Sequence, residues 1–287
     1  FETLWQAVSR HLKDPRLQQL FGRYATYVGS SPFQAVATLL LIAHVEQEGV
    51  WTVKGGMHEV ARAFERVFKR KGGVIHYDTS VKSIELSNGR VSSVTTSKGE
   101  RLDCKVVISN ADANAVAAGL FGEEAERAVP ALAVRDRSLS AITWCVHAKT
   151  SQFPLAFHNV FFSKDYKREF DALDQSYPPD PTIYICSQDR NGIVQDKERL
   201  LILINSPANG DRIEKNRDMV ERAMRKKLSD CGLMIDWSSA DATITSPQGF
   251  HALFPATNGA LYGRASHGFY ASFKRPGAKT KIPGLFL

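Results

Sequence analysis

Helical spacing of apolar residues dominates the first fifty positions. Apolar side chains recur there every three or four residues, which predicts amphipathic helices. Asp14-Pro15 and Ser31-Pro32 each join a capping residue to a first-turn proline, so we expect a second and a third helix to begin at these pairs. The third helix contains the stretch 37–45, which is apolar on nearly every face. It is shorter than the roughly 20 residues of a membrane span. We expect it to lie in a core, with an apolar cavity or a membrane surface as alternatives.

The pattern then changes from helical to alternating. Apolar positions predict an amphipathic helix over 57–70, ended by Gly72 in the left-handed conformation, and a short strand over 74–77. Asn88-Gly89 lies between alternating apolar residues, which is the strongest short hairpin signal. We therefore expect a β-meander with strands at 81–86, 90–97 and 101–109, whose last part, 106–109, is buried. A helix over 112–121 should follow.

The rest of the chain mixes strands with helices. Helices are predicted at 165–173 and 215–230, and 249–263 is typical of a loop rich in glycine and aromatic residues. The fold class is therefore α/β (α+β). The predicted strands are 139–148, 157–163, 181–187, 199–205 and 241–246.

Composition narrows the function classes. The chain has 287 residues and a formal net charge of +7, but its basic residues are scattered and no aromatic-and-basic RNA-binding module accompanies them. We therefore expect no nucleic acid partner and interpret the charge as a solvated surface, or as one suited to anionic lipid.

Cysteine usage and short motifs exclude further classes. The four cysteines are far apart, with no CxxC pair and no histidine at metal-ligand spacing, so we expect reduced thiols in a cytoplasmic protein and no metal site. The sequence contains no HExxH, GxSxG or phosphate-binding Walker loop.

One block of the sequence carries a family resemblance. The segment from Gly55-Gly56-Met57 through Val81, Ile84 and Asn88-Gly89 to Asn110-Ala111-Asp112 resembles the central block of the carotenoid desaturases. These are phytoene desaturase-like flavoproteins of the amine oxidase superfamily, and the chain looks most similar to their bacterial hydroxyneurosporene type. The C-terminal run SFKRPGAKTKIPGLFL and the N-terminal run DPRLQQLFGRYATYVGSSP also resemble parts of these enzymes.

The resemblance implies an architecture and a cofactor. It implies a partial FAD/NAD(P)-binding, doubly wound layer from 51–119 and 254–287, and a helix-and-sheet substrate domain from 1–50 and 120–253. Two family motifs are not in this sequence: the N-terminal GxGxxG loop and the glycine-rich segment expected after Leu287. The chain begins with Phe1 and ends in apolar residues, so we expect a segment of a longer protein that is inactive alone and binds FAD weakly or not at all.

Six residues are predicted to contact the cofactor. The resemblance places the backbone of Val81 beside the FAD adenine, and Gly55 and Gly56 close to the flavin ring, although the two glycines also suit a turn with positive φ. Asn110-Ala111-Asp112 follow a strand end, where such folds bind ligands, although an ordinary N-cap is an equal alternative. Tyr262, Arg264 and His267 precede the final flavin motif and are candidates to face the flavin.

Four residues are predicted to contact the substrate. Tyr24, Tyr27, Phe33 and Leu41 are candidates to line a tunnel for a lipophilic polyene, with a plain core position as the alternative. Flavin chemistry asks little of side chains, so the sequence singles out no catalytic residue. A carotenoid substrate dissolves in membranes, so we expect a protein that associates peripherally with the membrane surface.

Two other functions stay open from the sequence. One is another FAD-dependent enzyme of the superfamily: an amine oxidase, a carotene isomerase or a retinol saturase-like enzyme. The other is a non-catalytic binding domain without flavin loops.

Overall fold

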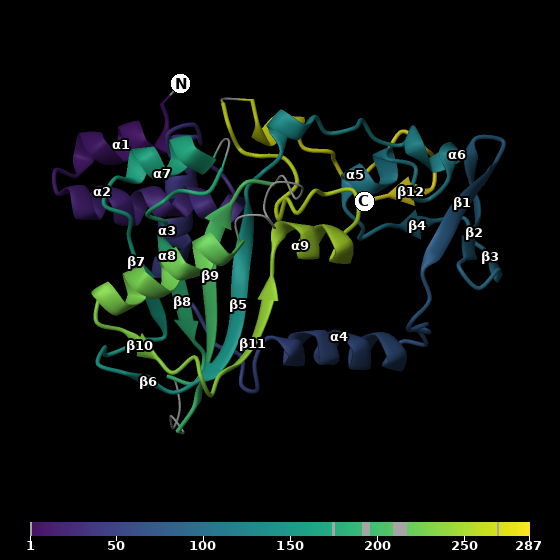
Figure 1. Ribbon diagram of the computed structural model, residues 1–287. Helices are drawn as coiled ribbons and strands as arrows, with labels where there is room; N and C mark the ends of the chain where they lie inside the picture. Colours follow the sequence, from purple (N-terminus) through teal and green to yellow (C-terminus); the bar gives the residue numbers. More distant parts are fainter. Residues whose placement is uncertain (1, 174–175, 191–195, 209–216, 269) are drawn as a thin grey trace.

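The computed structural model describes residues 2–173, 176–190, 196–208, 217–268 and 270–287. Within these residues the chain mixes helix and sheet, which confirms the predicted α/β (α+β) class. A large sheet lies beside the N-terminal helices, and a small β-meander lies at the other end of the molecule (Figure 1). Helix α4 (His58–Arg70) lies beside the lower end of the large sheet and below the level of the meander in this view.

The large sheet confirms the five strands predicted after residue 138. In the described residues every neighbouring pair of its strands is antiparallel, and each strand begins and ends within four residues of its prediction. In spatial order the strands are β11 (Asp241–Thr245), β5 (Ser140–Ala148), β9 (Glu198–Ser206), β8 (Ile183–Ser187) and β7 (His158–Phe161).

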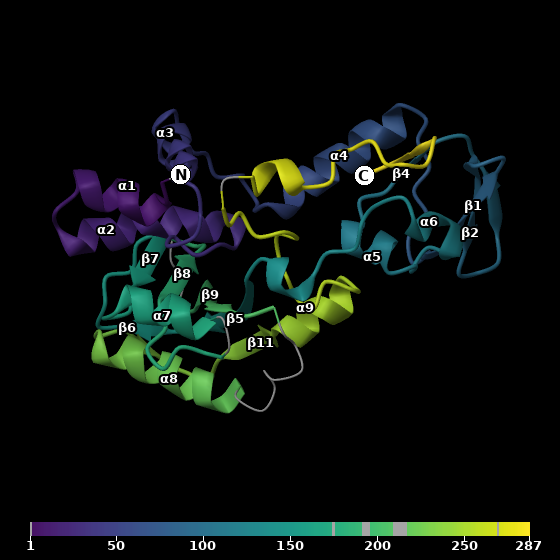
Figure 2. The same cartoon turned by 90° about the horizontal axis from the view of Figure 1, so that it is seen from above.

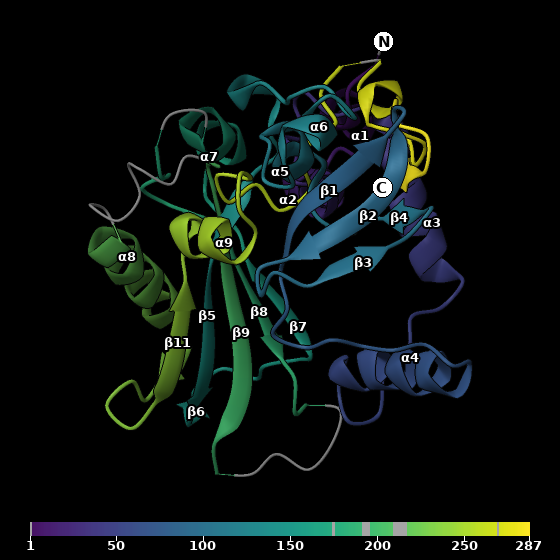
Figure 3. The ribbon, with the colours of Figure 1, turned by 90° about the vertical axis from the view of Figure 1, so that its right-hand side faces the viewer.

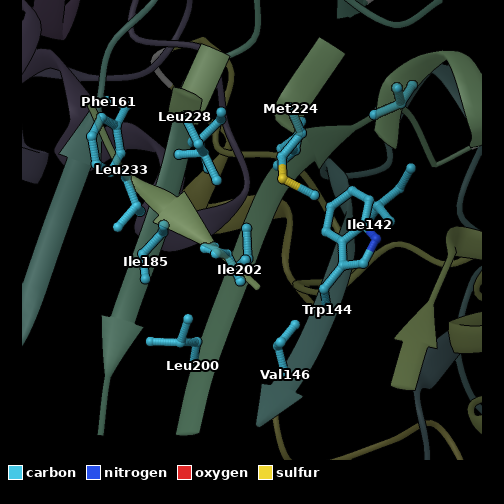
Figure 4. Packing of buried hydrophobic residues seen from close by; sticks show 14 of the residues in the cluster. Ile142, Trp144, Val146, Phe161, Ile185, Leu200, Ile202, Met224, Leu228 and Leu233 are labelled. Atoms are coloured by element: carbon cyan, nitrogen blue, oxygen red, sulfur yellow. The ribbon is translucent and has the colours of Figure 1, made fainter. Parts of the chain in front are cut away.

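One face of the large sheet packs against helix α8 (Arg217–Asp230). Side chains alternate between the two faces of a strand, so every second residue of β5, β8 and β9 enters this core. Figure 4 shows Trp144 and Ile142 beneath Met224 of α8. Each such apolar side chain contributes about 1.5–3 kcal/mol when fully buried. The other residues labelled there are Val146, Phe161, Ile185, Leu200, Ile202, Leu228 and Leu233.

Short elements complete this region. The predicted helix at 165–173 is confirmed as α7 (Tyr166–Leu173). The predicted helix at 215–230 is confirmed from Arg217 onward, and residues 215–216 lie outside the described residues. A small antiparallel pair, β6 (Thr150–Ser151) with β10 (Met234–Ile235), closes one end of the core.

The N-terminal helices cover the other side of the large sheet. Figure 2 shows α1 (Leu4–His11) and α2 (Pro15–Gly22) on the side of the sheet opposite α8. Asp14 caps α2 by accepting a hydrogen bond from the Arg16 N–H, as its proline pair predicts. The chain continues into the 3-10 helix η1 (Arg23–Val28).

The prediction for the third helix is wrong in two respects. Residues 31–36 form a turn and isolated bridges, so helix begins only at η2 (Ala37–Leu40) and continues as α3 (Leu41–Gln47). The expected core position for 37–45 is also wrong, because Leu41 and Val45 are each 64% exposed. Apolar composition on all faces did not ensure burial.

The second region is built on the predicted meander. Strands β1 (Val81–Ser87), β2 (Arg90–Thr96) and β3 (Arg101–Asp103) pair in order (Figure 3), and Asn88 and Gly89 both have positive φ, as a hairpin turn of this type requires. Strand β4 (Val107–Ile108) pairs in parallel with β12 (Leu285–Phe286). Helices α5 (Ala113–Ala117) and α6 (Glu123–Glu126) pack with these strands around a second core.

Other element predictions need correction. No strand forms at 74–77 within the described residues, and 106–109 is not buried, because Val106 is 55% and Ile108 76% exposed. The predicted helix 112–121 is shortened to α5. The expected loop 249–263 begins inside helix α9 (Pro247–Leu253), which Ser246 caps. The short 3-10 turns η3 (Val134–Asp136) and η6 (Ser272–Lys274) complete the described elements.

Candidate functional site

A cavity of about 800 Å³ lies on the face of the large sheet that α8 does not cover. We call it the sheet cavity. The strands β5, β7, β8 and β9 form its floor, and the segments from α2 to η1 and from α3 to residue 52 form much of its wall. The floor residues are Ala141, His158, Val160, Tyr184, Leu203 and Asn205. Because alternate side chains point to opposite faces, these residues stand back to back with the α8 core.

The lining of the sheet cavity also includes polar side chains, several of which are paired with one another. The Tyr24 hydroxyl donates to Glu46 Oε2 at 2.6 Å, and burial, with the Glu46 carboxylate as a second cause, raises the pKa of Tyr24 and of Tyr27. His158 Nδ1 lies 2.8 Å from the Tyr184 hydroxyl. Both tyrosines beside Glu46 therefore stay neutral at ordinary pH and present hydroxyl groups rather than charges.

The predicted substrate residues divide between two places. Tyr24 and Tyr27 line the sheet cavity. Phe33 packs instead in an aromatic cluster, with its ring 4.7 Å from that of Trp5 and 6.1 Å from that of Phe170. Leu41 is exposed and is not part of the cavity lining.

A second, smaller cavity of about 280 Å³ lies where β4 ends and α5 begins. We call it the basic pocket. It is lined by residues 109–114, by Tyr262, Gly263 and Arg264, and by Lys274 and Arg275, with further contributions from Pro130, Leu132, Pro276 and Leu287. The structure thus brings the predicted cofactor residues Asn110, Ala111 and Asp112 together with the predicted Tyr262 and Arg264.

Hydrogen bonds fix the wall of the basic pocket. The Asp112 carboxylate accepts from the Asn114 N–H at 2.8 Å and so caps α5, which is the N-cap alternative from the sequence. The Asn114 side chain donates to the Ala256 carbonyl at 2.6 Å and accepts from the Leu132 N–H at 3.0 Å. These bonds hold three distant segments of the chain together at this wall.

Positive charge gathers around the same pocket. Arg264 donates to Asp136 Oδ2 at 2.9 Å, and Arg275 donates to the Arg264 carbonyl at 2.7 Å. Arg137 joins Arg264 through a β-bridge, and its buried Nε and Nη1 have no hydrogen-bond partner among the described residues. Burial lowers the pKa of Arg137, and the Asp112 carboxylate opposes that shift. The cluster therefore offers donors and positive charge to an electron-rich ligand.

Tyr262 lines both cavities. Its backbone N–H donates to Ser138 Oγ at 3.0 Å, and the Ser138 N–H donates to the Gly263 carbonyl at 2.8 Å. The backbone of Gly29, at a φ of 61°, packs so tightly that an added Cβ would lie 2.6 Å from the Tyr262 ring. The ring is therefore held at the boundary between the sheet cavity and the basic pocket.

The other predicted cofactor residues lie outside both cavities. Val81 begins β1 and is 38% exposed. Gly55 and Gly56 precede α4 with φ values of 86° and 92°, which is the positive-φ turn that the sequence offered as an alternative. The predicted His267 accepts a hydrogen bond from the Ser31 N–H at 3.1 Å through Nε2.

Comparison with protein families shows which family the chain belongs to. The family model described as flavin containing amine oxidoreductase matches residues 5–287. The chain belongs to this family. The match confirms the flavoenzyme resemblance read from the central block and the C-terminal run.

Curated relatives within the family have related names. The chain is 47% identical to a hydroxyneurosporene desaturase from Rubrivivax gelatinosus over 100% of its own length and 56% of the relative. It is 31% identical to a 1-hydroxycarotenoid 3,4-desaturase from a Flavobacterium species, over 93% of the chain and 56% of the relative. The chain spans about half the length of the curated relatives it matches.

A solved structure supports the fold. An oxidoreductase from Methanosarcina mazei matches 100% of the chain and 62% of its own chain with a TM-score of 0.61 at 15% identity. Within the described residues, none of the helices is both long and apolar enough to cross a membrane.

Sequence reasoning missed the floor of the sheet cavity. The strands were predicted, but the prediction did not say which face of each strand borders the cavity and which faces the core. The alternation in β9 contains the signal, because Leu203 and Asn205 share one face and Ile202 and Ile204 share the other.

Proposed function

We propose that the intact protein is an FAD-dependent carotenoid desaturase that acts on a hydroxylated acyclic carotenoid. The sheet cavity carries the proposal, because it is a large, mostly apolar space of about 800 Å³ that meets a basic pocket at Tyr262. The relatives' names supply the substrate class, and the family supplies the flavin.

The residues of the basic pocket fit part of a flavin dinucleotide. Lys274, Arg275 and Arg264 line the pocket and offer positive charge, which suits phosphate or flavin carbonyl oxygens. A volume of about 280 Å³ is just below the range of roughly 300–1,000 Å³ for pockets that hold whole small molecules, so this wall accounts for only one portion of the cofactor. Asn110, Ala111 and Asp112 are proposed as cofactor contacts here, and Val81, Gly55 and Gly56 stay predictions.

The chain's own residues would orient the substrate and exclude water. When bound, FAD supplies the chemistry of accepting a hydride from the hydrocarbon chain. Tyr262 sets the boundary across which substrate and cofactor approach each other. Ala141, Val160 and Leu203 give the floor apolar surface that helps to exclude water, while neutral Tyr24 and Tyr27 add hydroxyl groups without charge.

The membrane surface is proposed as the source of the substrate. Glu46, Val50 and Thr52 line the sheet cavity, while neighbouring Leu41 and Trp51 are 64% and 79% exposed. Exposed apolar side chains beside the cavity suit insertion into a lipid surface, and the net charge of +7 suits anionic lipid. This proposal places the protein in the cytoplasm as a peripheral membrane protein.

The test uses the intact protein with added FAD and liposomes that contain a hydroxylated acyclic carotenoid. Desaturation lengthens the conjugated system, so the absorption maximum should move to longer wavelength. Lys274→Ala should weaken FAD retention roughly 3- to 10-fold, because one charge contact is lost. Exposed Lys279→Ala is the matched control and should retain FAD normally. An unchanged pigment spectrum with all acyclic carotenoids, together with turnover of an amine, would favour the amine oxidase alternative.

A further inference from the structure

Asn205 is a buried amide on the floor of the sheet cavity. It lies in β9 opposite Ala141 of β5, is 8% exposed, and shares its face of the strand with Leu203. Its nearest neighbours on that face, Ala141 and Leu203, are apolar. A carboxamide in such a place is unusual unless a partner satisfies it.

The Asn205 side chain has no hydrogen-bond partner in the part of the chain that the structure describes. Among the other polar groups of the cavity, Tyr24 bonds to Glu46 and His158 contacts Tyr184. Leaving a buried polar group unpaired costs stability, so such a group is usually kept for a ligand or a water molecule. The amide keeps contact with the open cavity, where a ligand can reach it.

The position of Asn205 along the sheet matters as much as its chemistry. Its cross-strand partner Ala141 lies two residues from Leu139, and the Leu139 carbonyl accepts from the N–H of Leu261, next to Tyr262. Asn205 therefore belongs to the end of the cavity that meets the basic pocket. His158 lies at the level of Leu201, four residues and roughly 13 Å farther along the strand direction.

We propose that Asn205 is a specificity-determining residue that hydrogen-bonds the hydroxyl group of a hydroxylated acyclic carotenoid. This inference rests on the proposed function. A carboxamide can both donate to and accept from an alcohol, and it carries no charge of its own. A relative's name places the hydroxyl on carbon 1 and the new double bond between carbons 3 and 4. The anchoring group must then lie near the reacting carbons, and Asn205 lies at the end of the cavity that Tyr262 also lines.

The test compares two substrates with the intact, FAD-loaded protein. One is a 1-hydroxylated acyclic carotenoid and the other is the same molecule without the hydroxyl. Asn205→Leu should lower kcat/KM for the hydroxylated substrate roughly 10- to 100-fold, because its hydroxyl loses its partner. The same variant should leave the unhydroxylated substrate unaffected or improve it. Asn205→Ala serves as a second variant if the leucine disturbs folding.

Thr143→Val is the matched control, because Thr143 pairs with Leu203 in the same sheet and is not part of the cavity lining. It should leave the ratio between the two substrates unchanged. Equal losses of kcat/KM on both substrates, or no loss with either Asn205 variant, would overturn the proposed role of Asn205. Desaturation by the wild-type protein would still support the proposed function in that case. A wild-type protein that desaturates neither substrate would overturn both.

Discussion

The backbone N–H of Tyr262 donates a hydrogen bond to the Oγ of Ser138, which is 1% exposed. This bond joins the start of the large sheet to the segment that separates the two cavities. Position in the sequence does not suggest the contact, since 124 residues separate the partners. The boundary between the sheet cavity and the basic pocket therefore depends on a hydroxyl that itself lines neither cavity.

Ser138→Ala should lower the free energy of unfolding by about 1–3 kcal/mol, because it leaves the Tyr262 N–H without its acceptor. Urea denaturation of wild type and variant measures the change. Ser97→Ala, at an exposed hairpin position, is the control and should be nearly neutral. Equal stability of Ser138→Ala and wild type would contradict the importance of this bond.

Glu169 should make the protein less stable as the pH rises. Its side chain is 2% exposed and accepts hydrogen bonds from the Thr182 N–H and hydroxyl, and burial raises its pKa above the ordinary value of 4.5. The folded state then binds more protons than the unfolded state above pH 4.5, so stability falls from there until the pH passes the folded-state pKa.

Glu169→Gln should remove this loss, because the amide stays neutral at every pH. Urea denaturation between pH 5 and 8 gives the slope for each protein. Exposed Glu100→Gln is the control and should keep the wild-type slope. A Glu169→Gln slope that matches wild type would show that Glu169 does not titrate in this way.

Glu85 should produce the opposite pH dependence. Its carboxylate accepts from the hydroxyls of Ser93, Thr95 and Ser83, which lower its pKa from 4.5 to about 2. The stabilisation is complete above pH 4.5 and is lost as the pH falls towards 2. Glu85→Gln should cost about 1–2 kcal/mol at pH 7 and little at pH 2, measured by urea denaturation. A cost that does not change with pH would rule out the charge as its source.

Gly284→Ala should disrupt the pairing of β4 with β12. Gly284 has a φ of 90°, and an added Cβ would lie 2.6 Å from the Lys105 carbonyl oxygen. We expect a loss of at least about 2 kcal/mol, seen as a lower Tm. Gly277→Ala is the matched control, because an added Cβ there meets nothing within 4 Å. Similar Tm values for the two variants would contradict the prediction.

Local signals in the sequence predicted much of the fold. Asn88-Gly89 fixed the hairpin because both residues tolerate positive φ, and Asp14-Pro15 fixed the start of α2. Ser246-Pro247 carries the same helix-start signal and begins α9, but the glycine-rich sequence around it suggested a loop.

Long-range features escaped prediction for a physical reason. Burial of the stretch 37–45 depends on which segments pack over it, and its composition alone does not specify them. The site residues behaved similarly. Tyr24 and Tyr27 were candidates because they are aromatic residues in the helical N-terminal region. The local sequence does not distinguish them from Phe33, which packs elsewhere. To predict Asn205 as a site residue, one needs both the alternation along the strand and knowledge of which face of the sheet helix α8 covers.

The back-to-back arrangement of the large sheet has an evolutionary consequence. Because the α8 side holds the hydrophobic interior, substitutions at Ala141 or Leu203 can reshape the opposite hollow without disturbing that interior. During evolution, single substitutions on that face can therefore change ligand preference, while thermal stability stays nearly the same.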